Sequence, residues 1–168
     1  KQENETAALD FLEKKFDGLK TNNIKILYDM GGIYKSFEKY DEAIKIYSKL
    51  LELLDNRSKA YADILYRRGG SFERIGDYET ADKDLLESLT ITSENPYVLN
   101  YLAYSWLERN YKIELSMEML KEAYDLRKND PYITDSLGWG YYLINDFKNA
   151  EKYLKKAVEL MPYDPIVN

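Results

Sequence analysis

One pattern recurs along this chain and restricts its fold more than any other feature. In three segments an aromatic residue is followed three positions later by alanine, and a glycine lies twelve positions before that alanine. The glycine and alanine pairs are Gly31 and Ala43, Gly69 and Ala81, and Gly138 and Ala150. A fixed period of this kind is the sequence signature of a repeat architecture, whose units bury their apolar faces by stacking on one another.

A further repeat fits between the second and third of these segments, with one extra residue in its turn. There Ala103 takes the glycine place, Trp106 an aromatic place and Ser116 the alanine place. Successive repeats begin near Ile24, Ala62, Pro96 and Pro131, at spacings of 38, 34 and 35 residues. Apolar residues within each half of a repeat recur at intervals of three and four, which is the helical period. Each repeat is therefore predicted to be a helix–turn–helix.

We expect a single array over residues 1–168. Its predicted repeats span residues 24–61, 62–95, 96–130 and 131–164. Residues 1–23 are interpreted as the flanking helix of a truncated repeat, and residues 165–168 as the start of another. We therefore expect the natural chain to continue at both ends.

Small residues at fixed places predict where the two helices of a repeat approach most closely. A helix-interior glycine costs about 1 kcal/mol relative to alanine, so Gly138 needs a compensating contact. A close approach to the helix of Ala150 would supply it. The pattern assigns no such contact to Gly140. The aromatic residues three positions after each glycine, or after Ala103, are expected in the core: Tyr34, Phe72, Trp106 and Tyr141.

The turns between the two helices of a repeat carry a second signal. Gly76, Asn110 and Asn145 lie at these turns, where the end of a helix favours the left-handed backbone conformation. Glu38 takes the same place in the first repeat.

This combination of residues resembles the tetratricopeptide repeat (TPR) family. The resemblance implies an all-α fold, a right-handed TPR superhelix (α-solenoid) of about four helix–turn–helix repeats plus a flanking helix. From Ala62 onward the chain is similar to the C-terminal repeats of bacterial TPR proteins, several of them exported or lipid-anchored. This leaves the compartment open between the cytoplasm and the periplasm of a bacterium. Arg68 departs from the family, since leucine is usual there.

The composition excludes most familiar chemistry. The chain contains no histidine and no cysteine, which removes the commonest general base and the commonest metal ligands. No phosphate-binding loop or dinucleotide fingerprint occurs. We therefore expect no catalytic residue, no metal and no cofactor, with a carboxylate-based enzyme as the distant alternative. The net charge of −6 argues against a nucleic-acid partner. The longest uncharged stretch, NPYVLNYLAYSWL, is too short to cross a bilayer, so no membrane insertion is expected.

The resemblance also implies a binding surface. In the family, the second, fifth, ninth and twelfth positions of each first helix line a concave groove. The partner-binding residues expected on this basis are Tyr28, Tyr66, Tyr97, Asn100, Tyr104, Tyr132, Asp135, Trp139 and Tyr142. The other residues at these positions are Lys25, Gly32, Lys35, Asp63, Gly70, Glu73 and Leu107.

The expected function is a non-catalytic scaffold or adaptor that binds a protein or an extended peptide in this groove. Alternatively, the aromatic residues pack against adjacent repeats, or the chain is an assembly module that forms a homo-oligomer through its truncated ends. Some TPR co-chaperones clamp a C-terminal carboxylate with Lys, Arg and Asn. The matching places here hold Tyr28, Gly32, Tyr97 and Tyr101, so that clamp is not expected.

Overall fold

The computed structural model describes residues 20–163 together with positions 7, 11 and 14. This part of the chain consists of helices joined by turns and contains no strand, which confirms the all-α fold class. The helix expected over residues 1–23 lies mostly outside the described residues, and the repeat expected to start at 165–168 lies wholly outside them.

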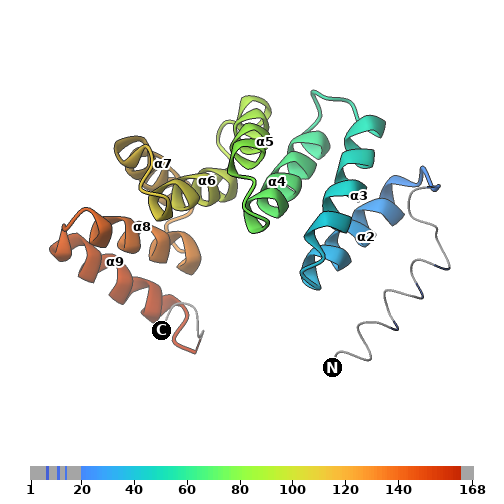
Figure 1. Cartoon of the computed structure of the whole chain (residues 1–168). Coiled ribbons are helices and arrows are strands. Elements are labelled where there is room, and N and C mark those ends of the chain that lie inside the picture. Colours follow the sequence, from blue (N-terminus) through green and yellow to red (C-terminus); the bar gives the residue numbers. More distant parts are fainter. Residues whose placement is uncertain (1–6, 8–10, 12–13, 15–19, 164–168) are drawn as a thin grey trace. The chain divides into compact units, whose positions relative to one another are not determined.

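Consecutive helices pair as hairpins, and each hairpin is one repeat (Figure 1). The pairs are α2 (Ile24–Ser36) with α3 (Tyr40–Leu53), α4 (Lys59–Arg74) with α5 (Tyr78–Ile91), α6 (Pro96–Glu108) with α7 (Ile113–Leu126), and α8 (Pro131–Leu143) with α9 (Phe147–Leu160). Helix α4 begins at Lys59, before the repeat start expected at Ala62, because the Ser58 side chain caps it by accepting a hydrogen bond from the Tyr61 backbone N–H at 3.0 Å.

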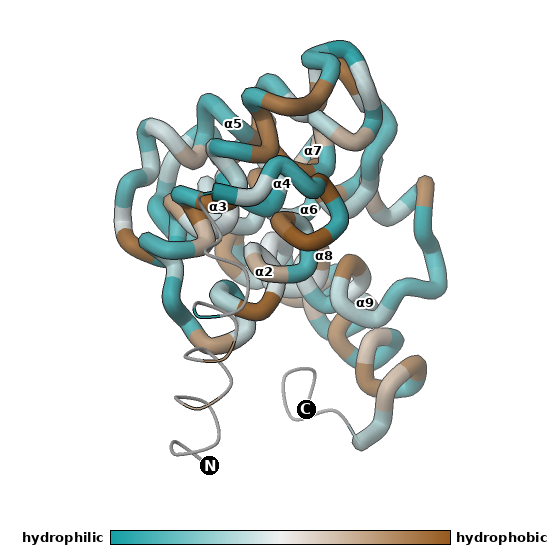
Figure 2. The backbone as a smooth tube through the Cα atoms, turned by 90° about the vertical axis from the view of Figure 1, so that its right-hand side faces the viewer, coloured by the Kyte–Doolittle hydropathy of each residue, from teal (hydrophilic) through white to brown (hydrophobic). Residues whose placement is uncertain are grey.

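The chain divides into two compact bodies, which are described separately below. The N-terminal body comprises Lys1–Thr92 and holds helices α2 to α5. The C-terminal body comprises Ser93–Asn168 and holds α6 to α9. Apolar and polar residues are interspersed along each helix (Figure 2), and the buried apolar residues form the core.

The turns confirm the expected backbone conformation. Gly76, Asn110 and Asn145 have φ values of 84°, 53° and 62°. Glu38 shares this left-handed conformation, with φ of 58°, although it is neither glycine nor asparagine. The turn between α6 and α7 has the predicted extra residue, Lys112, whose φ is 46°.

The two helical glycines of α8 contact different neighbours. A Cβ atom on Gly138 would lie 2.8 Å from Leu154 Cγ and 3.0 Å from the Leu154 backbone nitrogen, so α8 and α9 are in close contact there. This confirms the contact predicted for Gly138. A Cβ atom on Gly140 would instead lie 2.7 Å from Met117 Sδ and 3.2 Å from Leu107 Cδ1. Gly140 therefore lets α8 pack against the preceding hairpin, a role that the repeat pattern did not reveal.

The four aromatic residues expected in the core divide into two pairs. Tyr34 and Trp106 are buried, as predicted. Phe72 and Tyr141 are only half-buried, so for them the prediction of a full core position is wrong. At Tyr141 the ring stacks on Tyr153 of α9 at a centroid distance of 5.5 Å, and because Tyr153 is itself only half-buried, the pair is not enclosed in the core.

Candidate partner-binding surface

Seven of the nine expected binding residues lie on α6 and α8, the first helices of the two C-terminal repeats, which contact each other. We call this set the aromatic surface: Tyr97, Asn100 and Tyr104 on α6, with Tyr132, Asp135, Trp139 and Tyr142 on α8. Within each helix the residues recur at intervals of three and four, so they share one helical face. The four tyrosines are between 38% and 48% exposed, which is unusual for side chains with so much apolar area.

Trp139 is held in place by contacts with both helices. Its indole Nε1–H donates a hydrogen bond to Glu108 Oε1 on α6 at 2.6 Å. Its ring stacks on Tyr142 at a centroid distance of 5.1 Å with an angle of 21° between the planes. The indole is therefore half-buried and oriented before any ligand arrives, which lowers the entropy cost of binding.

Helices α6 and α8 themselves carry negative charge. Glu108 and Asp135 are the only ionisable Asp, Glu, Lys or Arg residues in α6 and α8. Burial raises the pKa of the Asp135 carboxyl above its ordinary value. Burial also raises the pKa of the Tyr104 phenol, and the carboxylates of Glu108 and Asp135 raise it further. The phenol of Tyr104 therefore lies close enough to both carboxylates for their charge to affect it.

Asn100 is a polar side chain near the middle of α6. Its Oδ1 atom is buried and accepts no hydrogen bond from the described residues. A buried acceptor without a donor costs about 1–3 kcal/mol.

Leu107 does not line an accessible groove, although its helix position predicted that it would. It occupies the twelfth helix position but is only 5% exposed, because it packs against Gly140 of α8. Gly70, another residue at an expected groove position, is also buried. Neither residue lies on an accessible surface.

The two remaining binding residues lie in the N-terminal body and have a different environment. Tyr28 of α2 is 37% exposed, and the Arg67 guanidinium of α4 lies 4.6 Å from its ring centroid. Arg67 also pairs with Asp63 at 2.8 Å. Tyr66 is half-buried, with Lys35 Nζ 6.0 Å from its ring centroid. Both tyrosines therefore already face a cation that the chain itself supplies.

Lys35 lies close to two other cationic side chains, Arg67 and Arg74. Lys35 is half-buried, and burial lowers the pKa of its ammonium group. The neighbouring guanidinium groups of Arg67 and Arg74 lower it further. Helices α2 and α4 of the N-terminal body therefore carry a net positive charge, whereas α6 and α8 of the C-terminal body carry a net negative charge.

The sequence analysis did not identify two residues that contact the expected binding residues. Glu108 accepts a hydrogen bond from Trp139, and Arg67 lies over the ring of Tyr28. Both lie outside the four helix positions that the family resemblance supplied. A signal for each was present, because Glu108 follows Tyr104 by one helical turn and Arg67 follows Asp63 by one turn.

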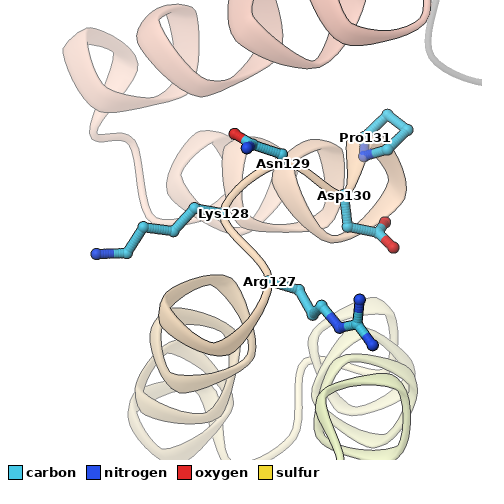
Figure 3. Close-up of a pocket in the computed structure, with 5 residues that line it drawn as sticks. All are labelled: Arg127, Lys128, Asn129, Asp130 and Pro131. Atoms are coloured by element: carbon cyan, nitrogen blue, oxygen red, sulfur yellow. The ribbon is translucent and has the colours of Figure 1, made fainter.

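A pocket of about 360 Å³ lies at the connection between α7 and α8 (Figure 3). It is lined by Arg127, Lys128, Asn129, Asp130 and Pro131. The Asp130 carboxylate already accepts hydrogen bonds from the backbone N–H groups of Tyr132 and Ile133, so it serves as the cap of α8. Figure 3 shows the Arg127 and Lys128 side chains pointing away from each other, so they do not converge on one bound group.

Neither a cluster of metal-ligating side chains nor a membrane-spanning helix occurs in the described part of the chain. No group of three or more acidic residues is placed to hold a metal ion there. Among the same residues, no helix has the length and apolar character needed to cross a bilayer.

Comparison with known proteins agrees with the hairpin architecture. The sequence profile of the tetratricopeptide repeat matches residues 24–53, 62–95 and 136–164, which together make up more than half of the chain. Among curated proteins, the TPR repeat-containing protein PA4667 of Pseudomonas aeruginosa is 29% identical over 74% of this chain. The anaphase-promoting complex subunit CDC16 of Saccharomyces cerevisiae is 27% identical over 80% of it. The chain spans only 24% and 15% of the lengths of these two relatives.

Solved structures show the same fold at lower identity. MamA superposes with a TM-score of 0.73 at 19% identity, covering 96% of this chain and 91% of its own. YrrB, described as a TPR protein with an unusual peptide-binding site, superposes with a TM-score of 0.68 at 17% identity. That match covers 98% of this chain and 81% of YrrB.

Proposed function

Because the chain belongs to the tetratricopeptide repeat family, whose members generally mediate protein–protein contacts, we propose that it is a non-catalytic adaptor. It binds an extended segment of a protein partner against the aromatic surface of α6 and α8. The absence of histidine and cysteine from the sequence supports a non-catalytic role. The peptide-binding site described for YrrB supports a peptide ligand on this fold.

The observation that carries the proposal is the exposure of Tyr97, Tyr104, Tyr132 and Tyr142 around an oriented Trp139. Tyrosine and tryptophan supply large contact areas with few rotatable bonds, and they dominate the energetics of protein interfaces. Asn100 adds a half-buried side-chain amide, which can pair with an extended backbone. Together these residues offer contact area and a hydrogen-bonding point on one surface.

A random peptide display library, selected on the whole chain, tests the proposal. Selected peptides are synthesised and their affinities are measured by calorimetry against three variants. Tyr104→Ala and Trp139→Ala should weaken binding by about tenfold or more, as expected at an interface hot spot. Leu86→Ala is the matched control, since Leu86 is 41% exposed but lies on α5 of the N-terminal body, whereas the aromatic surface lies on α6 and α8.

Two outcomes contradict the proposal. Either no peptide is selected, or the selected peptides bind all three variants as well as they bind the original chain. Sedimentation at several protein concentrations, run alongside, shows whether self-association competes with peptide binding.

A further inference from the structure

Two carboxylates, Asp135 in the aromatic surface and Glu108 next to Trp139, have no cationic partner in the described part of the chain. Neither Glu108 nor Asp135 forms an ion pair there. Nearby cations are engaged elsewhere: Arg109 Nε donates to the Ser105 carbonyl oxygen at 3.1 Å, and Lys112 Nζ lies 4.3 Å from the Trp106 ring centroid. Asp135 is half-buried, and a half-buried carboxylate without a counter-charge is unfavourable, so a cation brought by a ligand would compensate it. Glu108 is exposed and adds a second negative charge.

Arg127 does not compensate these acids either. Its guanidinium lies 5.8 Å from the ring centroid of Tyr97, near the first turn of α6. Glu108 is the last residue of that helix, which places it roughly 16 Å further along the axis at 1.5 Å per residue. The aromatic surface therefore has a cation at one end and two acids at the other.

The acidic end brings together groups that suit a guanidinium. Glu108 is hydrogen-bonded to Trp139, and both Glu108 and Asp135 act on Tyr104. A guanidinium is planar, stacks on aromatic rings and pairs with carboxylates through two parallel hydrogen bonds. It can make both kinds of contact at once, whereas an ammonium acts as a point charge.

The N-terminal body already contains this arrangement. The Arg67 guanidinium lies over the Tyr28 ring and pairs with the Asp63 carboxylate. There the arginine comes from the chain itself. At the acidic end of the aromatic surface the ring and the carboxylates are present, and the arginine is not.

We propose that the aromatic surface selects partner segments that carry an arginine, and that this arginine binds among Tyr104, Glu108, Asp135 and Trp139. The inference rests on the proposed adaptor function and adds the chemistry of the partner. Aromatic contacts supply the affinity for the segment, and the two carboxylates supply the preference for arginine.

The test uses selected peptides in two forms, one with arginine and one with citrulline, its uncharged isostere. On the original chain the arginine form should bind about tenfold more tightly, from the cation–π contact and the charge pairs together. Asp135→Asn combined with Glu108→Gln should reduce that preference to about twofold or less, because both substitutions keep the side-chain shape and remove the charge. Glu118→Gln, which removes an exposed charge from α7, should leave the preference unchanged.

The outcomes separate this inference from the adaptor function. Peptides that need Trp139 but bind equally well with citrulline would overturn the preference for arginine and leave the adaptor function standing. An arginine preference that survives the double substitution would also overturn the inference. If no selected peptide depends on Trp139, both proposals fail. A thermal melt confirms that the double variant is folded.

Discussion

Arg68 on α4 donates two hydrogen bonds to the carboxylate of Asp84 on α5, from Nε at 2.7 Å and from Nη2 at 2.8 Å. Its Nη1 also donates to Ser48 Oγ on α3 at 3.1 Å, so one guanidinium joins three helices of the N-terminal body. The Asp84 side chain is only 2% exposed and depends on Arg68 for compensation of its charge. Arg68, the residue that departs from the family pattern, therefore links the second repeat to the first through hydrogen bonds.

Arg68→Leu should lower the free energy of unfolding by about 3–5 kcal/mol, because it leaves the buried Asp84 charge without a partner. The double substitution Arg68→Leu with Asp84→Leu should recover most of that loss. Urea unfolding measures both. Arg67→Leu is the control, since its partner Asp63 is 41% exposed and the loss should stay below about 1 kcal/mol. Equal losses at Arg67 and Arg68 would contradict this account.

Gly138→Leu should destabilise the protein by about 1–3 kcal/mol through overpacking, despite the better helix propensity of leucine. The reason is that the Leu154 backbone nitrogen, which cannot move aside, lies 3.0 Å from the position of the new Cβ atom. Gly32→Ala is the control: no atom lies within 4 Å of its Cβ position, so helix propensity should stabilise the fold by about 0.5–1 kcal/mol. A more stable Gly138→Leu protein in urea melts would rule out the close contact.

Glu38→Gly should raise the free energy of unfolding by about 1 kcal/mol. Glu38 holds the left-handed conformation, with φ of 58°, which costs a residue with a Cβ atom about 1–2 kcal/mol. Asn145→Ala, at the equivalent turn between α8 and α9, should have the opposite effect. Thermal melts of both variants test the pair, and a destabilised Glu38→Gly protein would show that the glutamate side chain contributes more than its strain costs.

The two tryptophans should respond differently to quenching. Trp106 is 1% exposed, whereas Trp139 is half-buried at the aromatic surface. With Trp106→Phe, the remaining Trp139 emission should be red-shifted and quenched by acrylamide, and a bound peptide should protect it. With Trp139→Phe, the remaining Trp106 emission should be blue-shifted and insensitive to both. Equal quenching of the free protein in the two variants would place Trp139 in the core.

Asp135→Asn should stabilise the fold at neutral pH, since burial raises the pKa of this carboxyl and its charged form is the costly one. In the native state the carboxyl takes up its proton at a higher pH than the ordinary 3.8. The stability it contributes is therefore fully present below pH 3.8 and is lost as the pH rises through the raised pKa. The advantage of the variant should shrink as the pH falls through this window in urea melts. Glu118→Gln is the control, and a pH-independent advantage would contradict the burial argument.

The sequence by itself determined the repeat, its helical hairpins and its turns. These features are local or periodic: the glycine and alanine pairs are twelve residues apart, and the left-handed turns at Gly76, Asn110 and Asn145 follow from the residue at a single position. The close contact at Gly138 was predictable for the same reason, since both of its helices belong to one repeat.

Only the tertiary structure decided which side chains meet between repeats. The contact of Gly140 with Leu107, the hydrogen bond from Trp139 to Glu108 and the tie from Arg68 to Ser48 each join different hairpins. The partners of the last two are 31 and 20 residues apart, so no helical period links them. They depend on how one hairpin is rotated and shifted against the next, which is set by the packing of whole helices and not by any short stretch of sequence.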